Sequence, residues 1–79
     1  MISVQELGHE NTTIEILSTE IAKVVEIRNR SFNLVYVRYG NDIHNKRLEA
    51  GKVFQLDALV EKIYIIFDKK AIVNVTFAG

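Results

Sequence analysis

The sequence predicts a small all-β domain, an antiparallel β-sandwich or small barrel of about six strands, on three observations. Ile, Val, Thr and aromatic residues, which favour strands, recur in short stretches along the 79-residue chain. Apolar and polar residues alternate in the clearest of these stretches, as they do in a strand with one buried face. Turn residues separate the stretches roughly every eight to twelve residues, a spacing typical of sandwiches and barrels.

The N-terminal part is expected to precede the main domain. Residues 1–12 form an N-terminal segment or arm, in which Ile2 to Leu7 is either a further strand or a free arm. Residues 13–79 form the single β domain. One domain is what a chain of this length predicts.

The stretch from Thr12 to Arg28 has two interpretations. Four of its apolar residues fall at helical spacing: Ile14, Leu17, Ile21 and Val24. Thr12 and Glu15 also resemble a helix capping box. However, seven of the fifteen residues from Ile14 to Arg28 are Ile, Val or Thr, which favour strands. We therefore expect two strands, Thr13–Leu17 and Ile21–Arg28, with a helix as the alternative.

Four further strands are expected in the rest of the chain: Asn33–Tyr39, Lys52–Leu56, Val60–Phe67 and Ala71–Phe77. The residues from Gly40 to Arg47 are expected to form a polar loop. Gly51 supplies the positive φ that a tight turn needs before the strand that begins at Lys52. Residues 68–70 are few enough for a hairpin between the last two strands.

Alternation within these strands predicts a core and a second apolar face. The core residues are Val35, Val37, Ile63, Ile65, Val73 and Val75. The second face holds Leu34, Tyr36, Tyr64, Ile66 and Ile72. Exposed, it would be a larger apolar patch than monomeric proteins usually carry. We therefore predict a homo-oligomer whose contact lies near Tyr36 and Tyr64.

Composition restricts how such a small chain can be stabilised. A domain of this size buries only about 60–65% of its unfolded surface, and many such domains rely on disulfides, a metal or a partner subunit. The absence of cysteine excludes disulfides, and two histidines without a thiol do not make a usual structural zinc site. Oligomerisation remains. No cofactor or metal is expected.

The sequence also suggests where the protein resides. It has no apolar run of the ~20 residues needed to span a bilayer, and no basic start followed by a long apolar stretch. We therefore expect a protein that is made in a cytoplasm and has no membrane partner.

The charges are unevenly distributed, although the net charge is zero. Residues 1–26 hold five acidic residues against Lys23 alone, a net charge of −4. Residues 27–52 hold six basic residues against Asp42 and Glu49, a net charge of +4. Two explanations remain open: head-to-tail contact between copies, or pairing of the two segments within one sheet.

The sequence offers little for catalysis, and we expect no enzyme. His9 and His44 both lie in polar stretches and are expected to be solvated. Asp42 with His44 would supply only two metal ligands. The segment from Ala50 to Lys52 lacks the remaining features of a phosphate-binding loop and is expected to be a turn.

A small nucleic-acid-binding or regulatory barrel is the alternative function. Aromatic and basic residues alternate in the middle of the chain, as in single-strand binders: Arg28, Arg30, Phe32, Tyr36, Arg38 and Tyr39. The overall basic excess of a dedicated binder is absent.

The order of features from Val24 to Phe77 resembles a known group of proteins. An apolar strand ends in Ile27-Arg28-Asn29-Arg30-Ser31, and a V-Y-V element (Val35 to Val37) precedes Gly40. A turn then enters the strand of Lys52 and Val53, with Ala50 where the group commonly has proline. The sequence is similar to the small β-sandwich accessory proteins of tailed-phage virions, found as head-decoration, head-fibre or neck components.

The resemblance implies a non-enzymatic structural protein of a virion, made in the host cytoplasm. Such a protein associates with copies of itself, with three- or five-fold symmetry favoured over a dimer. It also attaches to a larger capsid, neck or tail protein. The resemblance carries over no catalytic residues.

Overall fold

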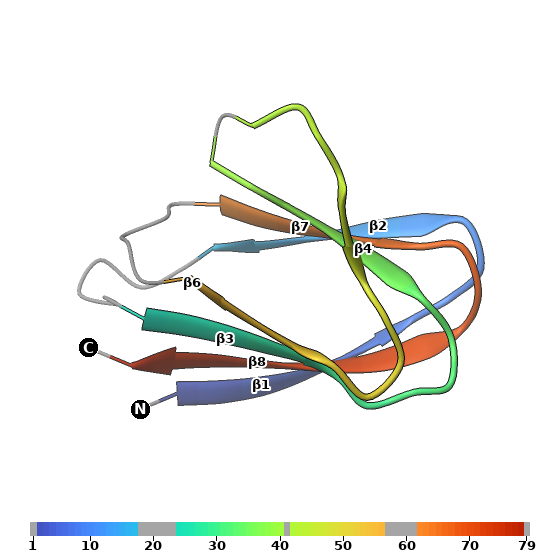
Figure 1. The fold of residues 1–79 in the computed structure, drawn as a ribbon, viewed down its shortest axis with the longest axis horizontal. Helices are drawn as coiled ribbons and strands as arrows, with labels where there is room; N and C mark the ends of the chain where they lie inside the picture. The colour runs from blue at the N-terminus through green and yellow to red at the C-terminus, as the bar shows by residue number, and fades with distance from the viewer. Residues whose placement is uncertain (1, 18–23, 41, 57–61, 79) are drawn as a thin grey trace.

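A computed structural model describes residues 2–17, 24–40, 42–56 and 62–78 of the chain. These residues form eight strands and no helix (Figure 1). The strands are β1 (Ile2–Gly8), β2 (Thr12–Leu17), β3 (Val24–Asn29), β4 (Val35–Tyr39), β5 (Lys46–Leu48), β6 (Val53–Leu56), β7 (Lys62–Phe67) and β8 (Ala71–Ala78).

The strands form two antiparallel sheets of four strands each. Sheet A has the order β1-β8-β3-β6, and sheet B has the order β2-β7-β4-β5. The two sheets lie as two layers, and the N- and C-termini lie near each other at one end of the molecule (Figure 1). The all-β sandwich expected from the sequence is confirmed.

The topology is that of one long antiparallel ribbon wound into two layers. The chain runs out through β1 to β4 and returns through β5 to β8, so that β1 pairs with β8, β2 with β7, β3 with β6 and β4 with β5. Paired residue numbers add to 79 for β1–β8 and β2–β7, to 81 for β3–β6 and to 83 for β4–β5. This arrangement of eight strands is a jelly roll.

The core lies between the two sheets. Alternate residues of the inner strands point into it, for example in β7, where Ile63, Ile65 and Phe67 are completely buried. All six core residues expected from the sequence are completely buried: Val35, Val37, Ile63, Ile65, Val73 and Val75. The prediction of the core is therefore confirmed.

Two elements differ from the sequence-based expectation of about six strands and a hairpin. The expected polar loop contains β5, which pairs with β4 although Leu48 is its one buried apolar residue. Residues 68–70 do not form a hairpin, because β7 belongs to sheet B and β8 to sheet A. Each strand has its own alternating set of inward residues, Ile63, Ile65 and Phe67 in β7 and Val73 and Val75 in β8. Such a pattern is expected both for two strands of one sheet and for two strands that face each other across a core, so it does not distinguish a hairpin from a crossing between sheets.

The N-terminal part of the chain belongs to the sheets. β1 pairs with β8 along its whole length, so the strand is the correct alternative for Ile2 to Leu7. Thr12–Leu17 and Val24–Asn29 are strands, as expected, and residues 18–23 between them lie outside the described residues. β1 and β2 pair with β8 and β7, and β3 pairs with β8 and β6. Among the described strands, the acidic residues 1–26 therefore do not pair with the basic residues 27–52.

Candidate functional site

The completely buried side chain of Asn29 holds the loop that joins β3 to β4. Its Nδ2 donates to the carbonyl oxygens of Asn33 (2.7 Å) and Leu48 (3.0 Å). Its Oδ1 accepts from the backbone N–H (3.0 Å) and the hydroxyl (2.7 Å) of Ser31. Every polar group of this side chain is therefore satisfied, as a buried amide requires.

The backbone of Asn29 ties the same loop to a second turn. Its N–H donates to the carbonyl of Lys52, and its carbonyl accepts from Gly51. Gly51 has a φ of 77°, which confirms the positive φ expected from the sequence, and Lys52 N–H donates to the carbonyl of Glu49 to close the turn. The end of β3, the loop and this turn are therefore held together.

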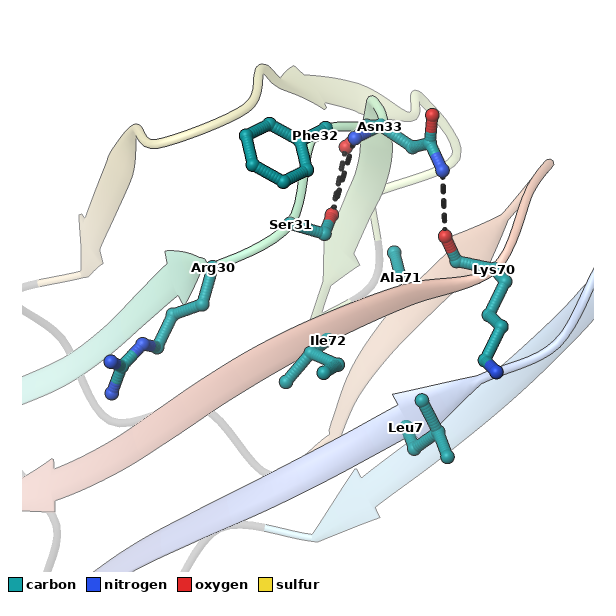
Figure 2. A pocket seen from close by; sticks show the side chains of 8 residues that line it. All are labelled: Leu7, Arg30, Ser31, Phe32, Asn33, Lys70, Ala71 and Ile72. Carbon is teal, nitrogen blue, oxygen red and sulfur yellow. Dashed lines mark hydrogen bonds between the residues drawn. The ribbon is translucent and has the colours of Figure 1, made fainter.

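Further hydrogen bonds fix residues 30–33 against β8. The Arg30 N–H donates to the carbonyl of Ile72 on β8 (2.9 Å). The Asn33 amide donates to the carbonyl of Lys70, just before β8 (2.7 Å, Figure 2). The Ser31 hydroxyl also contacts the backbone of Asn33. The loop is thus held at both ends and in its middle.

This loop presents Phe32, whose side chain is 100% exposed. Two hollows adjoin the ring. Leu7, Ala71 and Ile72 form the apolar side of one, which has a volume of about 240 Å³ (Figure 2). The other has a volume of about 320 Å³ and is lined by Arg28, Arg30, Gly51 and loop residues. Leu7 is itself 48% exposed.

Basic side chains surround this apolar centre. Arg30 and Lys70 lie on either side of Ile72 in Figure 2, and Arg28 lines the second hollow. The Arg28 Nη2 lies 3.6 Å from Oε1 of Glu26. None of the described residues that line the two hollows is acidic. We call this region the Phe32 surface; it consists of Leu7, Arg28, Arg30, Phe32, Lys70 and Ile72.

The five residues of the expected second face do not lie on one face. Tyr36, Tyr64 and Ile66 lie together on the outer side of sheet B, because Tyr36 pairs with Ile66 and Tyr64 is the next outward residue of β7. Ile72 lies on the outer side of sheet A and belongs to the Phe32 surface. Leu34 precedes β4 and is half-buried. The expectation that these five residues share one apolar face is therefore wrong, because those of them that lie in strands are divided between the two sheets.

The outer side of sheet B is partly covered by its own charged side chains. The Arg38 guanidinium lies over the Tyr64 ring, 4.6 Å from its centroid, which is a cation–π contact. The Lys62 ammonium lies 4.0 Å from the Glu15 carboxylate on the neighbouring strand. Tyr36 and Ile66 are half-buried. We call Tyr36, Arg38, Tyr64 and Ile66 the tyrosine face.

The residues of the nucleic-acid alternative are also divided. Arg28, Arg30 and Phe32 belong to the Phe32 surface, whereas Tyr36 and Arg38 belong to the tyrosine face on the other sheet. Tyr39 packs against the core, and its ring centroid lies 5.7 Å from that of Phe54. These aromatic and basic residues do not form one platform.

The loop between β4 and β5 holds a local ion pair. The Lys46 ammonium donates to the Asp42 carboxylate at 2.5 Å, and the His44 N–H donates to the other oxygen at 2.9 Å. These contacts hold the pKa of Asp42 below its usual value, and the same pair raises the pKa of Lys46. The described residues contain no group of three His, Asp or Glu side chains placed to hold a metal.

Comparisons with known proteins give information about the fold alone. No protein-family model and no curated protein matches the chain. The solution structure of a de novo designed double-stranded β-helix superposes with a TM-score of 0.77, covering 99% of this chain and 100% of that one. The two sequences are 13% identical. A helix with the length and apolarity to cross a bilayer is absent from the described part of the chain.

The sequence contained one signal for the Phe32 surface that the alternation pattern did not use. Phe32 stands between the turn residues Ser31 and Asn33, outside every expected strand core. A large aromatic residue in such a turn has no sheet face on which to pack. That Phe32 lines one hollow with Leu7 and Ile72 is not predictable without the topology, because these residues come from three distant parts of the chain.

Proposed function

We propose that this chain is a non-enzymatic attachment protein that binds another protein through the Phe32 surface. The observation that carries this proposal is the complete exposure of Phe32 on a loop held by buried hydrogen bonds. Aromatic residues are enriched among the few that dominate the affinity of protein interfaces. Because the loop is already fixed, binding costs it little conformational entropy.

The non-enzymatic part of the proposal is supported by the contacts of the polar side chains, which bind other parts of the same chain. All polar groups of the Asn29 side chain form hydrogen bonds that hold the loop. Asp42 and Lys46 neutralise each other next to Tyr39. These groups therefore have structural partners and contribute to stability.

The assembly proposed for this protein is a tailed-phage virion, where it would attach to a capsid, neck or tail protein. The sequence resemblance from Val24 to Phe77 supports this. The jelly roll is compatible with it, since virus capsid proteins use this arrangement, but lectins and cupins use it too. The fold is therefore a weaker argument than the exposed aromatic residue.

Self-association is a second part of the proposal and uses the tyrosine face. Tyr36 and Ile66 pair across adjacent strands and give this face an apolar centre. Tyrosine and arginine are both enriched at protein interfaces. Assembly about a symmetry axis would bury this face, while the Phe32 surface on the opposite sheet remains available for attachment.

Light scattering of the chain alone, and mixed with candidate capsid, neck and tail proteins, tests the proposal. We expect the chain alone to have a multiple of its 9.0 kDa mass, and Tyr36→Glu to lower that mass. We expect one mixture to form a complex that Phe32→Ser abolishes and Ile43→Ser, at another exposed apolar residue, does not. A 9.0 kDa monomer at high micromolar concentration that forms no complex would contradict both parts.

A further inference from the structure

We infer that the Phe32 surface binds an acidic protein segment that carries one large apolar side chain. This inference rests on the proposed attachment function and specifies the chemistry of the partner. Three observations support it: the size of the apolar hollow, the charges around it and the number of aromatic residues at the surface.

The first observation concerns the hollow between the loop that carries Phe32 and the outer side of sheet A. Its apolar side is formed by Leu7, Ala71 and Ile72, and its volume is about 240 Å³. Pockets for small molecules commonly have about 300–1,000 Å³ and bury most of the ligand. A smaller open hollow beside an exposed ring suits a single side chain inserted from another protein, which is how interface anchors are seated.

The second observation concerns charge. Arg30 and Lys70 lie on either side of Ile72, and Arg28 lines the adjoining hollow (Figure 2). The described lining residues include no acidic side chain that would neutralise Arg30 or Lys70. Carboxylates on both sides of the inserted apolar residue would complement these bases, steer the encounter and fix its register.

The third observation distinguishes a protein segment from a nucleic acid. Binding of single strands uses several aromatic rings on which successive bases stack. Phe32 is the one aromatic residue among the described residues of this surface, and its neighbours in the hollow are the aliphatic Leu7 and Ile72. Aliphatic walls suit an apolar side chain, so the observations favour a protein.

Selection of short random peptides on the immobilised chain tests this inference. We expect enriched peptides to carry a large apolar residue flanked by Asp or Glu. The affinity of the best peptide should fall at least tenfold for Phe32→Ser. It should also fall at least tenfold for the pair Arg30→Glu and Lys70→Glu, and weaken as salt screens the charges. The matched pair Lys62→Glu and Arg47→Glu, exposed on the other sheet, should change the affinity less than twofold.

The other outcomes separate the inferred partner from the proposed function. Enrichment of neutral or basic peptides that still require Phe32 would overturn the acidic partner and leave attachment through Phe32 intact. Peptides that bind the Phe32→Ser variant with the same affinity as the original chain would contradict the assignment of the binding site to the Phe32 surface. Stronger Phe32-dependent binding of an oligothymidine than of any peptide would replace the protein partner with a nucleic acid. Absence of any enriched peptide would overturn the inference, while the light-scattering experiment tests attachment independently.

Discussion

At the scale of single residues, Asn29 joins its own loop to a second region of the chain, residues 48–52. Its side chain contacts the loop at Ser31 and Asn33 and the end of β5 at Leu48. Its backbone contacts the turn at Lys52. One buried amide therefore determines where Phe32 is presented.

Replacing Asn29 with alanine should lower the free energy of unfolding by about 2–4 kcal/mol. The change removes the donors to the carbonyl groups of Asn33 and Leu48, and it removes the acceptor of two hydrogen bonds from Ser31. Urea unfolding followed by circular dichroism measures the effect. Asn33→Ala is the matched control, because it removes one exposed hydrogen bond, and it should cost less than about 1 kcal/mol. Equal effects of the two variants would contradict the role of Asn29.

Gly8 illustrates a close contact between the two sheets. A Cβ at this position would overlap the ring of Phe67, which is completely buried on β7. Gly8→Ala should therefore destabilise the fold by about 1–3 kcal/mol through overpacking. A double variant with Phe67→Leu provides the check. The Gly8→Ala substitution should cost less when the ring is absent, and additive effects would exclude the proposed clash.

At the scale of elements, β1 is an edge strand that completes sheet A. It pairs with β8 from Ile2 to Gly8, and Glu6 lies opposite the buried Val73 on the inward side. A half-buried inward charge on an edge strand discourages edge-to-edge pairing with another chain. β1 therefore both covers β8 and limits unwanted sheet extension.

Deletion of residues 1–8 should abolish cooperative thermal unfolding. The deletion uncovers β8 along seven residue pairs and removes the strand that covers Phe67. A small domain has only a few kcal/mol of stability to lose. Circular dichroism on heating is the measurement. A truncated chain that melts within a few degrees of the full chain would mean that the segment behaves as a free arm.

The two neighbouring isoleucines of β7 separate the core face from the outer face. Ile65 is completely buried, whereas Ile66 is half-buried on the tyrosine face. Ile65→Ala should cost about 2–5 kcal/mol, which is enough to unfold a domain this small. Ile66→Ala should cost less than half as much in the monomer. Chemical denaturation of both variants measures the difference, and similar losses would show that the faces are wrongly assigned.

The sequence predicted those elements whose alternation is long enough to identify an inward face. Ala71–Phe77 was expected, and β8 extends it by one residue. β5 was missed because three residues with one buried apolar side chain show no alternation. The expected hairpin at residues 68–70 was wrong because the alternation does not say whether consecutive strands share a sheet.

At the scale of the whole molecule, the jelly roll follows from one regular pairing scheme. Sums of paired residue numbers change only in steps of two, from 79 to 81 to 83. A shift of two residues keeps inward residues opposite inward residues, because strand side chains alternate with a period of two. The paired residue numbers of β3–β8 and of β4–β7 also add to the same sum, 102. The central strand pair therefore has the same register in both sheets.

This winding explains why the candidate site was only partly predictable. It brings Leu7, Phe32 and Ile72 to one end of sheet A from three separate regions of the chain. The same winding places Tyr36, Tyr64 and Ile66 on the other sheet. Alternation identifies outward residues correctly, but their division between two outer faces depends on long-range strand pairing.

The most direct test of attachment through Phe32 is the affinity of the chain for its partner protein, measured by titration calorimetry with two matched variants. Phe32→Ser removes an apolar residue that is 100% exposed, and Ile43→Ser removes one that is 80% exposed in the loop between β4 and β5. Both variants should keep the original melting temperature. We predict that Phe32→Ser weakens binding at least tenfold, or about 1.4 kcal/mol, and that Ile43→Ser leaves it unchanged. Equal affinities of the two variants would contradict the claim that this protein attaches through Phe32.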